Sequence, residues 1–131
     1  MPHLEGSDNA SIAMISSTAA LEKFMAAGAY NSMKAALIQY AGALAQDIGA
    51  KGIRVNAISP GPIFIEGGSW DFIKQNMTPL YEKTVGDIPV GRLGSAQEVA
   101  AQIALLASPL GAFTTATNIV IDGGFTKRIQ F

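Results

Sequence analysis

Residues 29–48 have the sequence AYNSMKAALIQYAGALAQDI, which is rich in alanine and leucine and predicts a long helix. Gly49 and Gly52 lie at its end, where a helix stop is expected. The segment SIAMI at residues 11–15 precedes the helix, and IRVNAI at residues 53–58 follows it. Short apolar runs of this kind are typical of strands buried on both faces of a parallel sheet. The order strand, helix, strand therefore predicts an α/β fold.

The second half of the chain predicts one more helix and one more strand. Residues 95–98 (SAQE) have the S-x-x-E spacing of a capping box, which marks the start of a helix. This helix should end before Pro109. Residues 118–122 (NIVID) predict a third strand, which the glycine pair at 123–124 follows. Three apolar residues lie on the helix face that should be buried: Val99, Ile103 and Leu106.

The stretch between these two halves is less regular. Across residues 67–86, only residues 70–75 predict a short helix, and Pro79 limits its extent. Three strands with flanking helices make a thin sheet with two bare edges. We therefore expect residues 1–131 to form a single partial domain, one part of a larger parallel sheet.

The composition is that of a globular protein with no expected affinity for nucleic acid or membranes. Hydrophobic residues make up 49% and charged residues 15% of the chain, a balance that favours a packed core over disorder. A formal net charge of -1 gives no basic surface to attract nucleic acid or anionic lipid. No apolar run approaches the roughly 18 residues that a membrane span needs. A cytoplasmic location is the default expectation.

Two residue types exclude several kinds of site. The chain has no cysteine, which excludes disulfides, thiolate nucleophiles and cysteine-ligated metals. Its single histidine, His3, lies at the start of the chain, so a Ser-His-Asp triad is not expected. We assign no metal ligands.

Tyr30 and Lys34 are four residues apart, so on a helix they lie on one face within reach of each other. A lysine is unusual in line with an apolar stripe, and a role in proton transfer would explain its presence there. An ammonium group beside a phenol stabilises the phenolate and lowers a tyrosine pKa from its ordinary value of about 10. Such a tyrosine can act as a general acid or base. The apolar stripe that continues this face consists of Leu37, Ala41, Leu44 and Ile48.

Ser17 lies thirteen residues before Tyr30 and follows the first predicted strand. Ligand sites of parallel α/β sheets form at the carboxyl ends of strands, so the Ser17 hydroxyl would lie where a substrate carbonyl is protonated by Tyr30. Because Y-x-x-x-K also occurs by chance on many helices, the residues alone leave open both a catalytic pair and an ordinary helix face.

The sequence resembles the short-chain dehydrogenase/reductase family along almost its whole length. The resemblance implies the C-terminal half of a Rossmann-like, doubly wound parallel sheet. It also implies an oxidoreductase that interconverts a small-molecule carbonyl and alcohol with NAD or NADP. Five segments carry the resemblance, in the family's order: SIAMISS (11–17), AYNSMKAAL (29–37), IRVNAISPG (53–61), GRLGSAQEVA (91–100) and NIVIDGG (118–124).

The resemblance implies a role for each residue of the catalytic helix and strand. Tyr30 would donate or accept the proton, and Ser17 would position the substrate oxygen. Lys34 would stabilise the phenolate and bind the ribose hydroxyls of the nicotinamide half of the cofactor. The hydride chemistry itself belongs to the cofactor.

The resemblance also places the surroundings of the nicotinamide. The backbone around Pro60, Gly61 and Ile63 would border it, and residues 66–84 would form a variable substrate lid. The lid is partly apolar, which suits a largely apolar substrate and ordinary packing equally well. Its large apolar residues include Trp70, Phe72 and Met77.

The sequence departs from the family pattern in two ways. Ile65 stands where the family often has a threonine that contacts the carboxamide. No glycine-rich phosphate turn opens a helix, since the glycine pairs at 67–68 and 123–124 lack the spacing. We therefore expect the dinucleotide-binding half to be absent and the isolated chain to be inactive. The alternative function is that of a catalytically inactive, truncated protein that acts as an interaction or oligomerisation module.

The catalytic helix also predicts a partner. Its face opposite Tyr30 carries small or uncharged residues, whereas an exposed helix usually shows charged ones there. Such residues permit close helix packing, so we expect a homo-oligomer through the Tyr30/Lys34 helix; an alanine-rich surface helix is the alternative. The face consists of Ser32, Ala35, Gln39, Gly42, Ala43 and Gln46.

Overall fold

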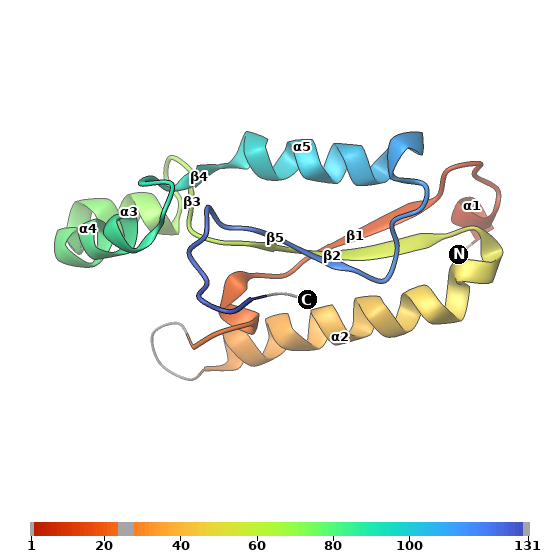
Figure 1. Ribbon diagram of the computed structural model, residues 1–131, viewed down its shortest axis with the longest axis horizontal. Coiled ribbons are helices and arrows are strands. Elements are labelled where there is room, and N and C mark those ends of the chain that lie inside the picture. Colours follow the sequence, from red (N-terminus) through yellow and green to blue (C-terminus); the bar gives the residue numbers. More distant parts are fainter. Residues whose placement is uncertain (1, 24–27, 130–131) are drawn as a thin grey trace.

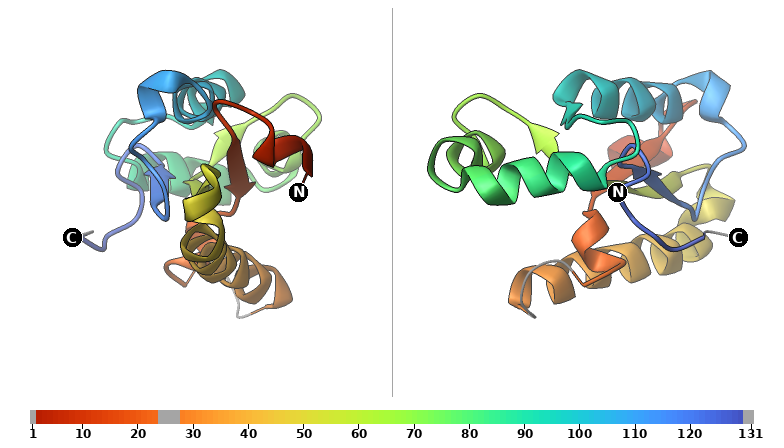
Figure 2. Two further views of the ribbon diagram at one scale, coloured as in Figure 1. Left: turned by 90° about the vertical axis from the view of Figure 1, so that its right-hand side faces the viewer. Right: turned by 60° about the vertical axis from the view of Figure 1, so that its left-hand side comes forward.

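Three parallel strands form the centre of the structure, with helix α2 on one face and helix α5 on the other (Figure 1). The computed structural model describes residues 2–23 and 28–129. Viewed from the end, the strands lie between α5 and α2 (Figure 2). This arrangement confirms the predicted α/β class with a parallel sheet.

In chain order the helices and strands are α1 Pro2–Glu5, β1 Ser11–Ile15, α2 Ala29–Ile48, β2 Arg54–Pro60, β3 Ile63–Phe64, α3 Ser69–Asn76, α4 Thr78–Asp87, β4 Gly94–Ser95, α5 Ala96–Ala107 and β5 Asn118–Ile121. Residues 2–23 and 28–129 also contain the short 3₁₀ helices η1 Thr18–Ala20, η2 Gly49–Lys51 and η3 Pro109–Gly111.

The middle strand, β2, is buried along almost its whole length. It pairs with β1 on one side and β5 on the other, and helices cover both of its faces. This confirms the buried strand expected at residues 53–58. The register runs from Ser11↔Arg54 to Ile15↔Ile58 for β1 with β2, and from Ala57↔Asn118 to Pro60↔Ile121 for β2 with β5.

Strand β1 corrects one expectation. The sequence predicts that residues 11–15 are buried on both faces, yet every residue of β1 is partly exposed and Ile15 is 43% exposed. The physical reason is that β1 is an edge strand: within residues 2–23 and 28–129 it pairs only with β2.

Helix α2 has the predicted bounds, and the predicted stripe faces the sheet. Ala41 and Ile48 are buried, while Leu37 and Leu44 are half-buried. After η2 the chain turns into β2 at Gly52, whose φ of 75° lies in the left-handed region that favours glycine.

The region between β2 and α5 is more regular than the sequence indicates. The short helix at residues 70–75 exists as α3, but a second helix, α4, follows it directly. Pro79 lies in the first turn of α4, where proline is tolerated because no helical N–H is required there. The two-residue strands β3 and β4 form a second small sheet that was not predicted. Both α3 and α4 lie beyond the carboxyl ends of the central strands (Figure 1).

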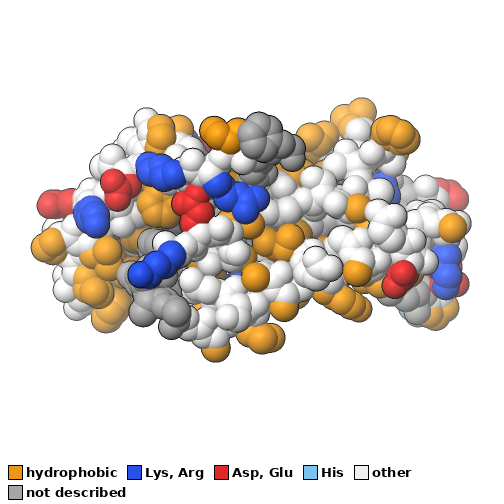
Figure 3. Space-filling model, turned by 60° about the horizontal axis from the view of Figure 1, so that its bottom comes forward, with side chains coloured by type: hydrophobic (Ala, Val, Ile, Leu, Met, Phe, Trp, Pro, Cys, Tyr) orange, Lys and Arg blue, Asp and Glu red, His pale blue; other side chains and the backbone are white. Residues whose placement is uncertain are grey.

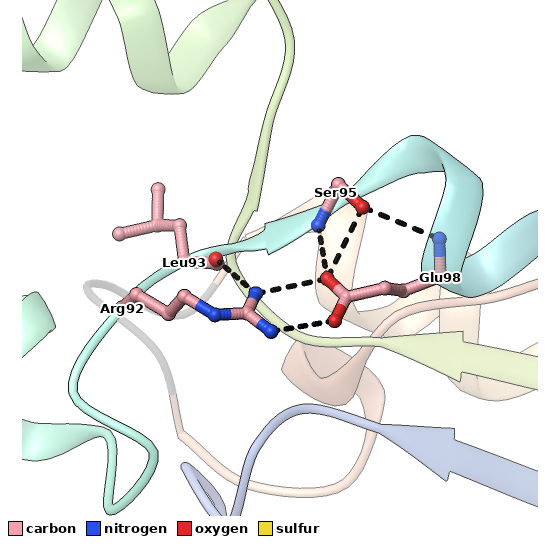
Figure 4. Close-up of polar contacts among 4 residues, drawn as sticks. All are labelled: Arg92, Leu93, Ser95 and Glu98. Atoms are coloured by element: carbon pink, nitrogen blue, oxygen red, sulfur yellow. Dashed lines mark hydrogen bonds and ion pairs between the residues drawn. The ribbon is translucent and has the colours of Figure 1, made fainter.

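The capping box at the start of α5 is confirmed, and Arg92 extends it (Figure 4). Ser95 Oγ accepts a hydrogen bond from Glu98 N (3.3 Å), and Glu98 Oε2 accepts one from Ser95 N (2.8 Å). Arg92 donates from both Nη atoms to the two oxygens of the Glu98 carboxylate, at 2.9 and 2.6 Å. The buried face of the helix is also as predicted: Val99 and Leu106 are buried and Ile103 is half-buried.

The Arg92–Glu98 pair predicts a pH-dependent contribution to stability. Hydrogen bonds from Arg92 and Ser95 lower the pKa of Glu98 from 4.5 to about 2. A carboxyl group with a lowered pKa stabilises the fold above its unfolded pKa and loses that contribution as the pH falls to its folded pKa. The Tm difference between wild type and Glu98→Gln should therefore be constant above about pH 5 and shrink between pH 4.5 and 2. A Tm difference that stays unchanged down to pH 2 would contradict the lowered pKa of Glu98.

Candidate active site

Ser17 lies two residues after the end of β1, at the carboxyl end of the sheet. Its backbone is extended, and its Oγ accepts a hydrogen bond from Ala19 N (3.2 Å), which caps η1. The side chain is therefore held in place by the first turn of η1. In the part of the chain that the structure describes, no hydrogen bond uses the Ser17 hydroxyl hydrogen, so it remains available to a ligand.

Tyr30 and Lys34 lie in the first two turns of α2, at the same end of the molecule as Ser17. Lys34 Nζ lies 5.7 Å from the centroid of the Tyr30 ring, so the predicted proximity exists. The same Nζ donates a hydrogen bond to the carbonyl oxygen of Ile15 (2.8 Å). The Tyr30 side chain is open to solvent and to the neighbouring cavity, with the residue 59% exposed.

Ser16 is a residue that the sequence analysis did not single out. Its N–H donates to the carbonyl oxygen of Ile58 (2.7 Å), and its Oγ donates to the carbonyl oxygen of Lys34 (2.7 Å). Together with the bond from Lys34 to Ile15, two hydrogen bonds of opposite direction join the end of β1 to α2. The only sequence signal for this role is a small polar residue directly after an apolar strand.

Pro60, Gly61 and Ile63 come from the end of β2 and the start of β3. Gly61 N donates to the carbonyl oxygen of Ile121 (2.9 Å), which continues the pairing of β2 with β5. A Cβ on Gly61 would lie 2.6 Å from Asp122 Cβ. Only a glycine lets the chain pass the end of β5 this closely.

Asp122 holds the turn that follows β5. Partial burial raises the pKa of its carboxyl group, but hydrogen bonds from Thr126, Gly124 and Phe125 outweigh burial and leave the pKa below its ordinary value. Because the carboxylate accepts from the turn that contains Phe125, it fixes where the chain runs after β5.

One cavity of about 710 Å³ is lined by Ser16, Ser17, Tyr30, Lys34 and the segment Pro60–Ile63. The six residues proposed from the sequence all line it, although they come from three separate segments of the chain. The lining residues are Ile15–Ala19, Tyr30, Lys34, Pro60–Ile63, Ile65, Gly68–Trp70, Ile73, Ala96, Val99, Ala100, Ile103 and Phe125.

The expected lid contributes only part of its apolar residues to this cavity. Trp70 and Ile73 of α3 line it, as does Ile65, which precedes the helix. Phe72 and Met77 are exposed and do not line it. Only one face of α3 therefore lines the cavity, because successive helical residues point in different directions; that residues 66–84 form a substrate lid stays a prediction.

Neither a membrane span nor a metal cluster is found in residues 2–23 and 28–129. None of the described helices is long and apolar enough to cross a membrane. No described group of three or more His, Asp or Glu side chains is placed to hold a metal ion.

The close packing of Gly61 predicts the effect of adding one methyl group. Gly61→Ala should destabilise the fold by about 1–3 kcal/mol, because the new Cβ forces Asp122 and the end of β5 apart. Gly86→Ala is the matched control, since nothing lies within 4 Å of a Cβ at that position. Urea unfolding of both variants measures the difference; equal stabilities would refute the close approach.

Comparison with known proteins identifies relatives over nearly the whole chain. A family model described as Enoyl-(Acyl carrier protein) reductase matches residues 2–126. The chain is 44% identical to isoepoxydon dehydrogenase patN of Aspergillus clavatus over 131 residues, which cover 99% of this chain and 51% of the relative. It is 42% identical to isoepoxydon dehydrogenase patN of Penicillium expansum, with the same coverage. The chain thus spans about half the length of these relatives.

A solved structure shows the same relationship. The NADPH-bound short chain oxidoreductase of Pseudomonas aeruginosa PAO1, described as containing an atypical catalytic center, superimposes with a TM-score of 0.86 at 30% sequence identity. The match covers 98% of this chain and 50% of that one. With the family match over residues 2–126, these similarities show that the chain belongs to the short-chain dehydrogenase/reductase family of oxidoreductases.

Proposed function

We propose that this chain carries the catalytic residues of an NAD(P)-dependent oxidoreductase that interconverts a carbonyl and an alcohol. The observation that carries the proposal is the meeting of Ser17, Tyr30 and Lys34 on one cavity at the carboxyl ends of the parallel strands. Relatives named as dehydrogenases and a structural neighbour described as NADPH-bound support this reaction class.

Two hydroxyl groups would act on the substrate oxygen. Ser17 is held by its bond from Ala19 N and keeps its own hydrogen free, so it can donate to that oxygen. Tyr30 lines the same cavity, and its hydroxyl would transfer the proton. Proton transfer by a positioned side chain and orientation by a second one are the protein's share of the reaction.

Lys34 would orient the cofactor and support Tyr30 electrostatically. An ammonium group has three donors, and the bond to the Ile15 carbonyl oxygen uses one, which leaves two for ribose hydroxyls. The backbone at Pro60–Ile63 would border the nicotinamide. These residues fit the nicotinamide end of the cofactor, which supplies or accepts the hydride when bound.

The residues of this chain do not provide the other end of the cofactor site. A pyrophosphate is usually held by a glycine-rich turn that opens a helix, and the 131 residues contain none. We therefore propose that residues 1–131 correspond to the catalytic half of the family fold and bind the cofactor weakly on their own.

The cavity favours an uncharged, largely apolar substrate. Among its described lining residues, Lys34 is the only one with a formal charge, and α3 contributes Trp70 and Ile73. Apart from Lys34, the described lining residues offer no cation that could pair with an anionic group on the substrate. Isoepoxydon, the compound in the names of two relatives, is the first substrate to assay.

Replacing Tyr30 by phenylalanine tests the proposed chemistry. Tyr30→Phe should lower kcat/KM by about 10²–10⁴-fold while leaving Tm unchanged, because it removes a proton donor and little packing. Tyr40→Phe is the matched control, since Tyr40 is on the same helix, is 56% exposed against 59% for Tyr30, and does not line the cavity. The rates of oxidation and of reduction are measured with NAD(H) and with NADP(H), using the whole protein that the reading frame encodes. Equal activities of the two variants would refute the assignment.

We also propose a homo-oligomer through the outer face of α2. Members of the family are typically oligomeric. Figure 3 shows the molecule from the side on which α2 lies: charged side chains gather over the left half and centre of the view and at its right end, and a stretch to the right of the centre carries none. Gln39 and Ala43 lie on this face and are exposed.

Introducing charge on this face should break the assembly. Gln39→Glu combined with Ala43→Lys should reduce the mass measured by light scattering, because charges must lose their water when the helices pack. Gln39→Ala with Ala43→Ser keeps the face small and uncharged and should leave the mass unchanged. An oligomer that tolerates both pairs of substitutions does not use this face.

A further inference from the structure

The segment Pro62–Ile63 separates the candidate active site from a second cavity. On one side it lines the 710 Å³ cavity described above. On the other it lines a cavity of about 220 Å³, whose wall also contains Arg92 and Glu98. A segment with a cavity on each side has few neighbours to hold it, so its position depends on specific contacts.

The direct support of this segment is strand β4. Ile63 pairs with Gly94 in the parallel ladder, and Gly94 N donates to the carbonyl oxygen of Pro62 (3.0 Å). A Cβ on Gly94 would lie 2.6 Å from Ile63 Cδ1, so the Ile63 side chain lies directly against the strand. A ladder of two residues per strand is weak alone, and β4 needs an anchor of its own.

Arg92 and Glu98 provide that anchor (Figure 4). The Arg92 guanidinium forms a two-pronged bond to the Glu98 carboxylate and also donates to the carbonyl oxygen of Leu93 (3.1 Å). The same carboxylate accepts from Ser95 N and Ser95 Oγ. The residues on both sides of Gly94 are thus bound to the first turn of α5, which Val99 anchors in the core.

We propose that the Arg92–Glu98 pair holds β4 against β3 and thereby fixes the Pro62–Ile63 wall of the candidate active site. Both are positioning residues, because they reach the site through β4 rather than by touching a ligand. That this wall matters for binding a nicotinamide rests on the proposed function. The mechanical connection, which runs from the Arg92–Glu98 pair through β4 to Pro62–Ile63, does not depend on it.

An ion pair that is not bonded to a strand would not fix a cavity wall in this way, and the chain contains such a pair for comparison. Lys51 Nζ bonds to Glu5 Oε1 at 2.8 Å near the amino ends of the strands, with side-chain exposures of 55% and 42%. The Arg92–Glu98 pair is equally exposed, at 56% and 45%. The two pairs differ in geometry, because only the second is two-pronged and shared with a strand.

Amide hydrogen exchange by NMR tests the mechanical connection. In Arg92→Gln, the Gly94 amide should exchange about two- to fivefold faster, since the anchor of its strand is lost while the serine cap remains. Arg92→Lys keeps the positive charge but cannot form the two-pronged bond to Glu98, so its Gly94 exchange rate should lie between those of Arg92→Gln and wild type. Glu5→Gln removes the control pair and should leave Gly94 exchange unchanged.

A binding measurement tests the consequence for the site. Trp70 is the only tryptophan and lines the cavity, so its fluorescence can follow a titration with NADPH. Arg92→Gln should weaken NADPH binding about two- to fivefold relative to both wild type and Glu5→Gln.

The two measurements separate the possible failures. Unchanged Gly94 exchange in Arg92→Gln overturns the inference, whatever the binding result. Faster exchange with unchanged NADPH binding overturns the role of the pair toward the cofactor. If wild type binds neither NADH nor NADPH, the proposed function fails for this chain, and the exchange result still decides whether the pair holds the wall.

Discussion

The burial of β2 is the constraint on which the rest of the structure depends. This strand pairs on both edges and is covered by α2 and α5, so its register sets where β1 and β5 end. At its carboxyl end Pro60 and Gly61 pass close to Asp122, and the chain continues into β3 beside the cavity. The site lies at this edge because all three strands end there.

The second organising feature is the link between β1 and α2. Ser16 donates to the carbonyl oxygen of Lys34, and Lys34 donates to that of Ile15, so strand and helix hold each other at the site. This explains how a lysine in line with an apolar stripe is accommodated: its ammonium group reaches a carbonyl oxygen at the end of a strand. A structural link and a proposed catalytic group are here the same side chain.

Periodicity and capping signals predicted the long elements well. The bounds of α2, the capping box of α5 and the three central strands follow from apolar spacing and from a serine three residues before a glutamate. The same reasoning missed α4 and the β3–β4 pair. Two-residue strands carry no periodicity, and a helix with proline in its first turn resembles a break. The exposure of β1 was also missed, because the strand pattern does not show which strand is at an edge.

The sequence by itself determined the α/β class, the family and the six candidate site residues, because local spacing and motif order are properties of the chain alone. Only the tertiary structure decided that Ser17, Tyr30, Lys34 and Pro60–Ile63 line one cavity. It alone also showed the Ser16 link and the anchoring of β4 by Arg92 and Glu98. These features depend on contacts between segments far apart in sequence, or on the direction of individual hydrogen bonds, which no local pattern encodes.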